Sequence, residues 1–172
     1  MTSYNYRSSI ANGWDPEWFG IKGNRRFTTS LSNKIKEFQK AEGLSVDGLC
    51  GSKTAEIIRK KQSGNFIYMH TKAVPIDSPV LSWCDDGGLK AEKGSYREKT
   101  GKRNPTLFVN HWDVCLSSES CHKVLSSRNL SCHFYIDNDG RIFQTMNTNH
   151  VAWHAGGRRW NDRSIGVEIS CA

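Results

Sequence analysis

The chain has 172 residues, of which 24 are Lys or Arg and 17 are Asp or Glu, giving a formal net charge of +7. Its hydrophobic fraction of 37% and its 15 glycines are typical of a globular chain and exclude a disordered or collagen-like one. A chain of this length has room for one core and a small second domain, but not for more than two domains. Every apolar run stops well short of the roughly 20 residues that span a bilayer, so we predict no membrane insertion.

The beginning of the chain does not have the pattern of a secretory signal. Between Met1 and Ile10 no basic region is followed by an apolar one, so we expect a cytoplasmic location. The six cysteines form no Cys-x-x-Cys pair. In a reducing compartment they are expected to be reduced and mostly buried thiols.

The first organised segment has the periodicity of short amphipathic helices. Leu31, Ile35 and Phe38 recur at helical spacing, which predicts a helix that ends at Gly43. Ser52 is the expected N-cap of a second short helix. Two such helices bury little by themselves, so the aromatic residues before them should complete the core: Trp14, Trp18, Phe19 and Phe27. We predict a small all-α module over residues 14–61.

After a polar linker at residues 60–65, the period changes to that of strands. The pattern predicts strands, a hairpin and one helix in the order 66–69, 107–109, helix 117–127 with Ser117 as cap, hairpin 132–145 and strand 164–170. Residues 84–104 are rich in Lys, Arg and Gly and are expected to form a surface loop. This order indicates an α/β domain over residues 66–172.

Two residues of this domain are candidates for chemistry. His111 follows a predicted strand and is placed to present a ring nitrogen to a cleft, as a metal ligand does, although a hydrogen-bonded structural histidine remains an alternative. Glu168 lies among apolar residues, where burial would raise its pKa toward neutrality; a solvent-facing edge-strand position is the alternative. A Glu and a His on two strands of one sheet indicate zinc-assisted hydrolysis.

Other interpretations of the same region are weaker. A zinc finger would draw on Cys115, Cys121, His122, Cys132 and His133. Their spacings do not form the short pairs of such sites. A nucleophilic Cys132 activated by His133 is disfavoured because adjacent strand residues point to opposite faces. The basic surplus fits nucleic acid, but it fits a polyanionic cell wall equally well.

Four motifs of the second domain carry a family resemblance. In chain order they are His111-Trp112-Asp113, then Ser131-Cys132-His133-Phe134-Tyr135-Ile136 with Asp139-Gly140-Arg141, then Ala152-Trp153-His154-Ala155-Gly156, and Asn161-Asp162-Arg163-Ser164-Ile165-Gly166-Val167-Glu168-Ile169. Over residues 106–170 the chain resembles the zinc-dependent N-acetylmuramoyl-L-alanine amidases of type 2, which include bacteriophage endolysins. Residues 31–58 are similar to the helical peptidoglycan-binding domain often attached to such enzymes.

The resemblance implies roles for single residues. His111 matches the first zinc-binding His, and Glu168 matches the Glu that acts as general base. His133, Trp153 and His154 fall in motifs beside the metal and the substrate cleft, which implies substrate binding. Cys132 occupies the position of a catalytic Tyr in some members.

The family's second zinc His and third ligand, an Asp or Cys, follow the strand that carries the Glu. Here only His111 is assignable, and Cys171 is the one thiol just after Glu168. We therefore expect a mixed β-sheet flanked by helices whose C-terminal part is missing. Either the sequence is a fragment of a longer amidase, or it is a product that kept wall recognition and lost catalysis.

The combined expectation is an endolysin-type hydrolase that cleaves the amide between N-acetylmuramic acid and L-alanine with a zinc-bound water. Its cofactor is Zn²⁺ and its partner is bacterial peptidoglycan, with no nucleic acid, and it is a monomer held in the host cytoplasm before release. The alternative is a non-catalytic peptidoglycan-binding protein with a degenerate or truncated amidase domain.

Overall fold

The computed structural model describes residues 2–170, which divide into two compact units. The first unit comprises the chain up to Gly64 together with Tyr68–Val74, and the second comprises Asn65–Ile67 and the chain from Pro75 onward. The hairpin of β1 (Asn65–Met69) and β2 (Lys72–Ile76) is therefore shared between them. Cys171, considered above as a thiolate donor, lies outside the described residues.

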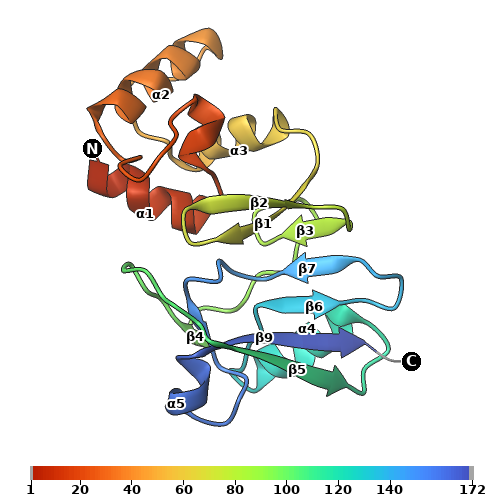
Figure 1. The fold of residues 1–172 in the computed structure, drawn as a ribbon. Coiled ribbons are helices and arrows are strands. Elements are labelled where there is room, and N and C mark those ends of the chain that lie inside the picture. Colours follow the sequence, from red (N-terminus) through yellow and green to blue (C-terminus); the bar gives the residue numbers. More distant parts are fainter. Residues whose placement is uncertain (1, 171–172) are drawn as a thin grey trace. The chain divides into compact units, whose positions relative to one another are not determined.

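The first unit is helical (Figure 1). Its elements are α1 (Thr2–Asn12), the 3-10 helix η1 (Pro16–Phe19), α2 (Thr29–Ala41) and α3 (Ser52–Lys60). The predicted aromatic residues do complete its core, which buries Trp14, Phe19, Leu31, Ile35, Cys50, Ala55 and Ile58, with Trp18 and Phe27 packed against them. The predicted cap is wrong by one residue: Gly51 is the N-cap of α3, and Ser52 is already helical. The predicted module did not include α1.

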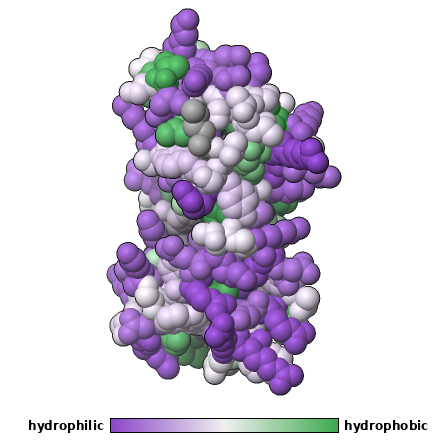
Figure 2. Space-filling view, turned by 90° about the vertical axis from the view of Figure 1, so that its left-hand side faces the viewer, coloured by the Kyte–Doolittle hydropathy of each residue, from purple (hydrophilic) through white to green (hydrophobic). Residues whose placement is uncertain are grey.

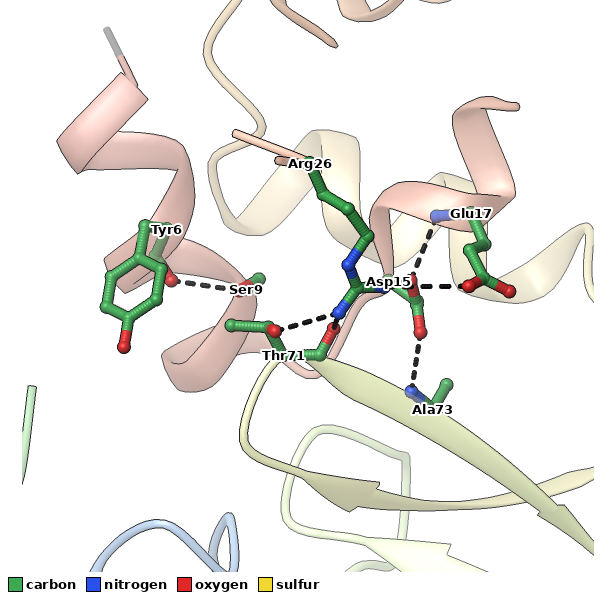
Figure 3. A network of polar contacts seen from close by, with 7 residues as sticks. All are labelled: Tyr6, Ser9, Asp15, Glu17, Arg26, Thr71 and Ala73. Atoms are coloured by element: carbon green, nitrogen blue, oxygen red, sulfur yellow. Dashed lines mark hydrogen bonds and ion pairs between the residues drawn. The ribbon is translucent and has the colours of Figure 1, made fainter. Parts of the chain in front are cut away.

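A buried ion pair ties the hairpin tip to this unit (Figure 3). Asp15 Oδ1 lies 2.5 Å from Arg26 Nη1 and also accepts the Glu17 N–H, which caps η1. Asp15 Oδ2 accepts the Ala73 N–H at 3.0 Å, and Arg26 Nη2 donates to the Thr71 carbonyl and hydroxyl. Both charged side chains are less than a tenth exposed, so each depends on these partners for its solvation.

The second unit is built on a mixed sheet, as predicted, with the strand order β3-β7-β6-β9-β5. The strands are β3 (Val80–Ser82), β5 (Leu107–Asp113), β6 (Phe134–Ile136), β7 (Ile142–Gln144) and β9 (Ser164–Ser170). β9 is parallel to both of its neighbours, β5 and β6, whereas β6 and β7 form the predicted antiparallel hairpin. A separate antiparallel pair joins β4 (Tyr96–Arg97) to β8 (Val151–Ala152).

The two faces of the sheet have different roles. Ile165 and Val167 of β9 pack with Phe134 on one face. Residue alternation puts Glu168 on the other face, together with Tyr135, its register partner in β6. The helix α4 (Ser118–Ser127) lies across the sheet (Figure 1), and its Cys121 joins Tyr135 in the core of the Glu168 face.

The helix α4 and the segment 84–104 can each be compared with what the sequence predicted for them. Ser117 caps α4 as predicted, accepting the Ser120 N–H. Val124 of this helix is 47% exposed. The segment 84–104 was predicted to be a surface loop; it contains β4, and Arg103 near its end is buried. Arg103 is buried because its guanidinium donates to the carbonyls of Asn161 and Ser164.

The remaining observations concern the protein surface and the cysteine side chains. Within residues 2–170 no helix combines the length and the apolarity that crossing a bilayer requires. The face drawn in Figure 2 is largely hydrophilic, with hydrophobic residues in small separate areas. The five cysteines of the described part of the chain are free thiols: Cys50, Cys84, Cys115, Cys121 and Cys132.

Candidate metal centre

The candidate site begins with two neighbouring strands. The parallel register of β5 and β9 pairs His111 with Glu168, so both side chains leave the same face of the sheet. β9 is an interior strand, which rules out the edge position considered for Glu168. Glu168 is only 7% exposed, and this burial raises the pKa of its carboxyl group, as predicted.

His154 reaches this site from the loop between β8 and the short helix α5 (Arg158–Asn161). Its Nδ1 lies 2.9 Å from His111 Nε2. The loop is held by Asn161, whose Oδ1 accepts the backbone N–H groups of His154 and Ala155 at 3.2 and 2.8 Å. The ring lies over Gly166, where a Cβ atom would come within 2.5 Å of His154 Cγ. Gly166 is therefore needed for the close approach of this ring to the sheet.

The hydrogen bonds of Ser164 fix the tautomer of His154. The Ser164 hydroxyl donates to the Trp160 carbonyl at 2.8 Å, so its oxygen must accept the hydrogen of His154 Nε2, 2.9 Å away. The Nδ1 lone pair of His154 is then directed at His111. Burial, with smaller contributions from His111 and Arg103, lowers the pKa of His154 to about 4 and keeps the ring neutral.

Cys132 adds a sulfur to the cluster. It lies two residues before β6 and is fully buried, and its thiol donates to Glu168 Oε1 at 3.5 Å. Burial and the neighbouring Glu168 raise the pKa of this thiol. One ligand atom from each of His111, Cys132 and His154 lies within 4.8 Å of the others. Imidazole nitrogen and thiolate sulfur are ligands that zinc prefers, so this donor set fits the metal.

His133 is placed differently from its sequence neighbour. Its side chain has no exposed surface; Nδ1 accepts the Gly166 N–H at 3.1 Å, and Nε2 donates to the His150 carbonyl at 3.1 Å. Burial, followed by the nearby Arg103, lowers the pKa of His133 to about 3. These contacts support a positional role between two strands. The substrate contact predicted for His133 stays a prediction, and its side chain has no exposed atoms with which to make one.

Trp153 borders a pocket next to the His154 loop. The pocket has a volume of about 350 Å³, and its walls include Trp153, Asn161, Arg97 and Arg158. Trp153 is 38% exposed, which leaves part of its ring available to a ligand. Both arginines pair with Asp162, which balances part of their charge. The pocket thus combines a mainly apolar, partly aromatic lining with charged residues in its walls, and it shares Asn161 with the His154 loop.

Sequence analysis missed the contributions of Cys132, Ser164 and Gly166. Cys132 was considered as a zinc-finger donor, as a nucleophile and as the counterpart of a catalytic Tyr, and the other two only as parts of a motif. The usable signal was a Ser two residues ahead of a Gly in a buried strand, since such small residues leave room for a neighbouring ring. The predicted pair His111 and Glu168 is brought together, and His154 joins it directly.

The fold and the donor set define an α/β domain with a candidate metal centre beside a buried carboxyl group. Residues 101–172 match the model of the N-acetylmuramoyl-L-alanine amidase family, and residues 11–58 match that of the peptidoglycan binding domain. These two matches support an N-acetylmuramoyl-L-alanine amidase domain that is preceded in the chain by a peptidoglycan-binding domain. No curated protein matches the chain.

Several solved structures are similar to parts of the chain. A selenomethionine derivative of AmpD is 24% identical, with a TM-score of 0.40 over 49% of this chain and 62% of that one. The Staphylococcus aureus hydrolase AmiA in complex with its ligand is 20% identical, with a TM-score of 0.43 over 56% and 46%. A mutant endolysin from Bacillus subtilis is 23% identical, with a TM-score of 0.38 over 54% and 61%. The chain thus spans less than two thirds of each of these proteins.

Proposed function

We propose that this protein is an endolysin-type hydrolase that cleaves the amide between N-acetylmuramic acid and L-alanine in bacterial peptidoglycan. The observation that carries the proposal is the pairing of His111 with the buried Glu168, inside the segment that matches the amidase family. The peptidoglycan-binding match at residues 11–58 supports the same substrate.

Zinc is the metal we propose for the site, with His111 as one of its ligands. Zinc supplies two effects in such a site, because it lowers the pKa of a water molecule and polarises the amide carbonyl. The histidines and the thiol around His111 offer nitrogen and sulfur donors, as this metal requires.

Glu168 is the proposed general base. Its carboxylate would take a proton from the attacking water and return it to the nitrogen of the departing L-alanine. The raised pKa of Glu168 suits both steps, because a group that titrates closer to neutrality can accept a proton and also give it back. Its burial also limits competition from bulk water for the same oxygen atoms.

Substrate contacts are proposed at the pocket beside His154. The exposed part of Trp153 would pack against a sugar or lactyl group, and Arg97 and Arg158 would lie near the acidic groups of the peptide stem. The N-terminal domain would hold the enzyme on the insoluble wall and so raise its local concentration there. The net charge of +7 favours the same anionic surface.

The proposed biological setting is lysis of a bacterial host by a bacteriophage. The enzyme would accumulate in the host cytoplasm as a monomer and act on the wall after release. This part of the proposal follows from the assignment as an endolysin.

The test uses the full chain loaded with zinc and purified sacculi. We expect new N-terminal L-alanine amino groups and no new reducing sugar ends. Glu168→Gln should lower the rate at least about 100-fold, as loss of a general base does, and leave zinc content unchanged. Glu119→Gln, which alters a half-buried glutamate of α4, is the matched control and should retain the parent rate.

Two results would overturn the proposal. If Glu168→Gln cleaves as fast as its parent, the general base is wrong. If the zinc-loaded chain sediments with sacculi but releases no amino groups, it is a non-catalytic peptidoglycan-binding protein.

A further inference from the structure

We infer that His154 is a positioning residue for His111: it accepts the hydrogen of His111 Nε2 and thereby leaves Nδ1 of His111 as the nitrogen that binds zinc. The inference deepens the proposed function and rests on it for the identity of the metal. It concerns His111 alone among the zinc ligands. It gives His154 a different role from the substrate contact that its motif suggested.

The contact between the two rings is an end-to-end hydrogen bond. His111 Nε2 and His154 Nδ1 lie 2.9 Å apart. The ring centroids are 5.2 Å apart, and the ring planes are nearly perpendicular, at 86°. The centroids are farther apart than the nitrogens by the width of an imidazole ring, so both nitrogens lie close to the line that joins the centroids. A hydrogen on either nitrogen would therefore point almost straight at the other, as a strong hydrogen bond requires.

Ser164 decides which of the two nitrogens carries that hydrogen. A neutral imidazole has a single N–H group. The Ser164 hydroxyl donates to the Trp160 carbonyl, so its oxygen accepts the Nε2–H of His154. Nδ1 of His154 then has only a lone pair, and the hydrogen between the rings must come from His111 Nε2. The hydrogen bonds therefore all run in one direction, from His111 through His154 and Ser164 to a backbone carbonyl.

The same rule leaves Nδ1 of His111 without a hydrogen. Among the hydrogen bonds that residues 2–170 make with one another, none involves this nitrogen. The ring is half-buried, so it is not sealed inside the core. A neutral imidazole binds a metal through the nitrogen that carries no hydrogen, and in His111 that nitrogen is Nδ1.

His154 takes a place that an oxygen atom fills in most metal sites. A ligating histidine usually donates its other N–H to a carboxylate, a backbone carbonyl or a water, which fixes its tautomer and orientation. Here the acceptor is an imidazole nitrogen, and the carbonyl of Trp160 stands at the end of the chain of hydrogen bonds. Two features keep the acceptor in place: Asn161 holds the backbone of His154, and Gly166 lets the ring lie against the strand.

This arrangement leaves His154 no ring nitrogen for another partner. Nδ1 accepts from His111, and Nε2 donates to Ser164. A metal ion or a substrate could bind a nitrogen of His154 only by replacing one of these hydrogen bonds. A role of His154 as a zinc ligand is therefore a distinct outcome of the experiment.

The experiment observes the ring nitrogens of the full chain by proton–nitrogen correlation NMR with isotope-labelled histidine. The signals are assigned with His111→Gln and His154→Gln. In the metal-free parent at neutral pH we expect both rings to carry their hydrogen on Nε2. When zinc is added, the Nδ1 signal of His111 should shift, while its Nε2 keeps the hydrogen and both nitrogens of His154 keep their state.

Ser164→Ala tests the direction of the chain from a residue that does not touch His111. The variant leaves the Nε2–H of His154 buried without an acceptor, which is unfavourable. His154 can then carry its hydrogen on Nδ1 and donate to His111, which moves the hydrogen of His111 onto Nδ1. We expect averaged tautomer signals at His111 and zinc binding about 10–100-fold weaker, as for loss of an outer-shell partner. Ser82→Ala is the matched control, because Ser82 is equally buried in the same sheet but donates to Asp85; it should keep the parent tautomers and affinity.

The inference is overturned if the metal-free parent carries the hydrogen of His111 on Nδ1. It is also overturned if zinc leaves the Nδ1 signal of His111 unchanged or shifts a nitrogen of His154 as a ligand, or if a folded Ser164→Ala keeps the tautomers and affinity of Ser82→Ala. Should Ser164→Ala fail to fold, the parent spectra still decide. Zinc bound at Nδ1 without cleavage of sacculi refutes the proposed function alone, whereas Glu168-dependent cleavage by a chain whose His111 carries its hydrogen on Nδ1 refutes this inference alone.

Discussion

Replacing Gly166 with Ala is a direct test of the site, because the structure leaves no room for a methyl group there. The added Cβ would lie 2.5 Å from Cγ, 2.6 Å from Nδ1 and 2.7 Å from Cδ2 of His154. Carbon atoms in contact are about 3.5–4.0 Å apart, so the ring must move by about 1 Å or more. The backbone cannot move instead without loss, since the Gly166 N–H and carbonyl are both bonded to His133, at 3.1 and 3.0 Å.

A movement of this size is about twice what a metal site tolerates. Functional groups must stay within about 0.5 Å of their productive positions. We therefore expect Gly166→Ala to weaken zinc binding at least about 10–100-fold, comparable to the loss of a supporting partner. The overpacked strand should also lose about 1–3 kcal/mol of unfolding free energy.

The assays are a zinc titration against a competing chelator and urea unfolding of the metal-free protein. Gly157→Ala is the matched control, because its φ of 177° is extended backbone and an added Cβ meets no atom within 4 Å. The control should keep the affinity and stability of the parent. If Gly166→Ala binds zinc as tightly as the control, the place of the His154 ring beside His111 does not matter to metal binding, and the reasoning is wrong.

Two further predictions concern stability. Asp15→Asn should lower the unfolding free energy of the helical unit by about 3–5 kcal/mol, because it leaves the buried Arg26 without its charge partner. Glu37→Gln removes one member of an exposed ion pair and should lower it by less than about 1 kcal/mol. Urea unfolding followed by Trp fluorescence measures both. The metal-free protein should lose stability on acidification, because His133 has a folded-state pKa of about 3, below its unfolded value of about 6.5. That contribution is complete above pH 6.5 and is lost as the pH falls toward 3, by about 1.4 kcal/mol for each pH unit in between. Unfolding free energies measured from pH 7 to pH 4 in parent and His133→Gln should therefore converge, and a constant difference would contradict this assignment.

The sequence predicted best what short-range patterns determine. Ser117 as the cap of α4 and the strand from Ser164 to Ser170 follow from local chemistry and alternation, and both are confirmed. Arg103 was expected at the surface because of its charge. Its burial depends on carbonyl groups about 60 residues away, which no local pattern contains.

The candidate site shows the same division between local and long-range information. Alternation places Cys132 and His133 on opposite sides, which argued against a Cys–His nucleophile, and the structure agrees: the thiol contacts Glu168, while the imidazole bonds to Gly166. The sequence did not reveal which residues the two side chains would contact, because that depends on the register between β6 and β9. Gly166 lies two residues before Glu168 in β9, and the absence of a side chain there leaves room for the ring of His154. The imidazole of His133 accepts the Gly166 N–H and so holds this part of the backbone in place. One dipeptide therefore places a thiol beside Glu168 on one side, and on the other side it holds the backbone over which the ring of His154 lies.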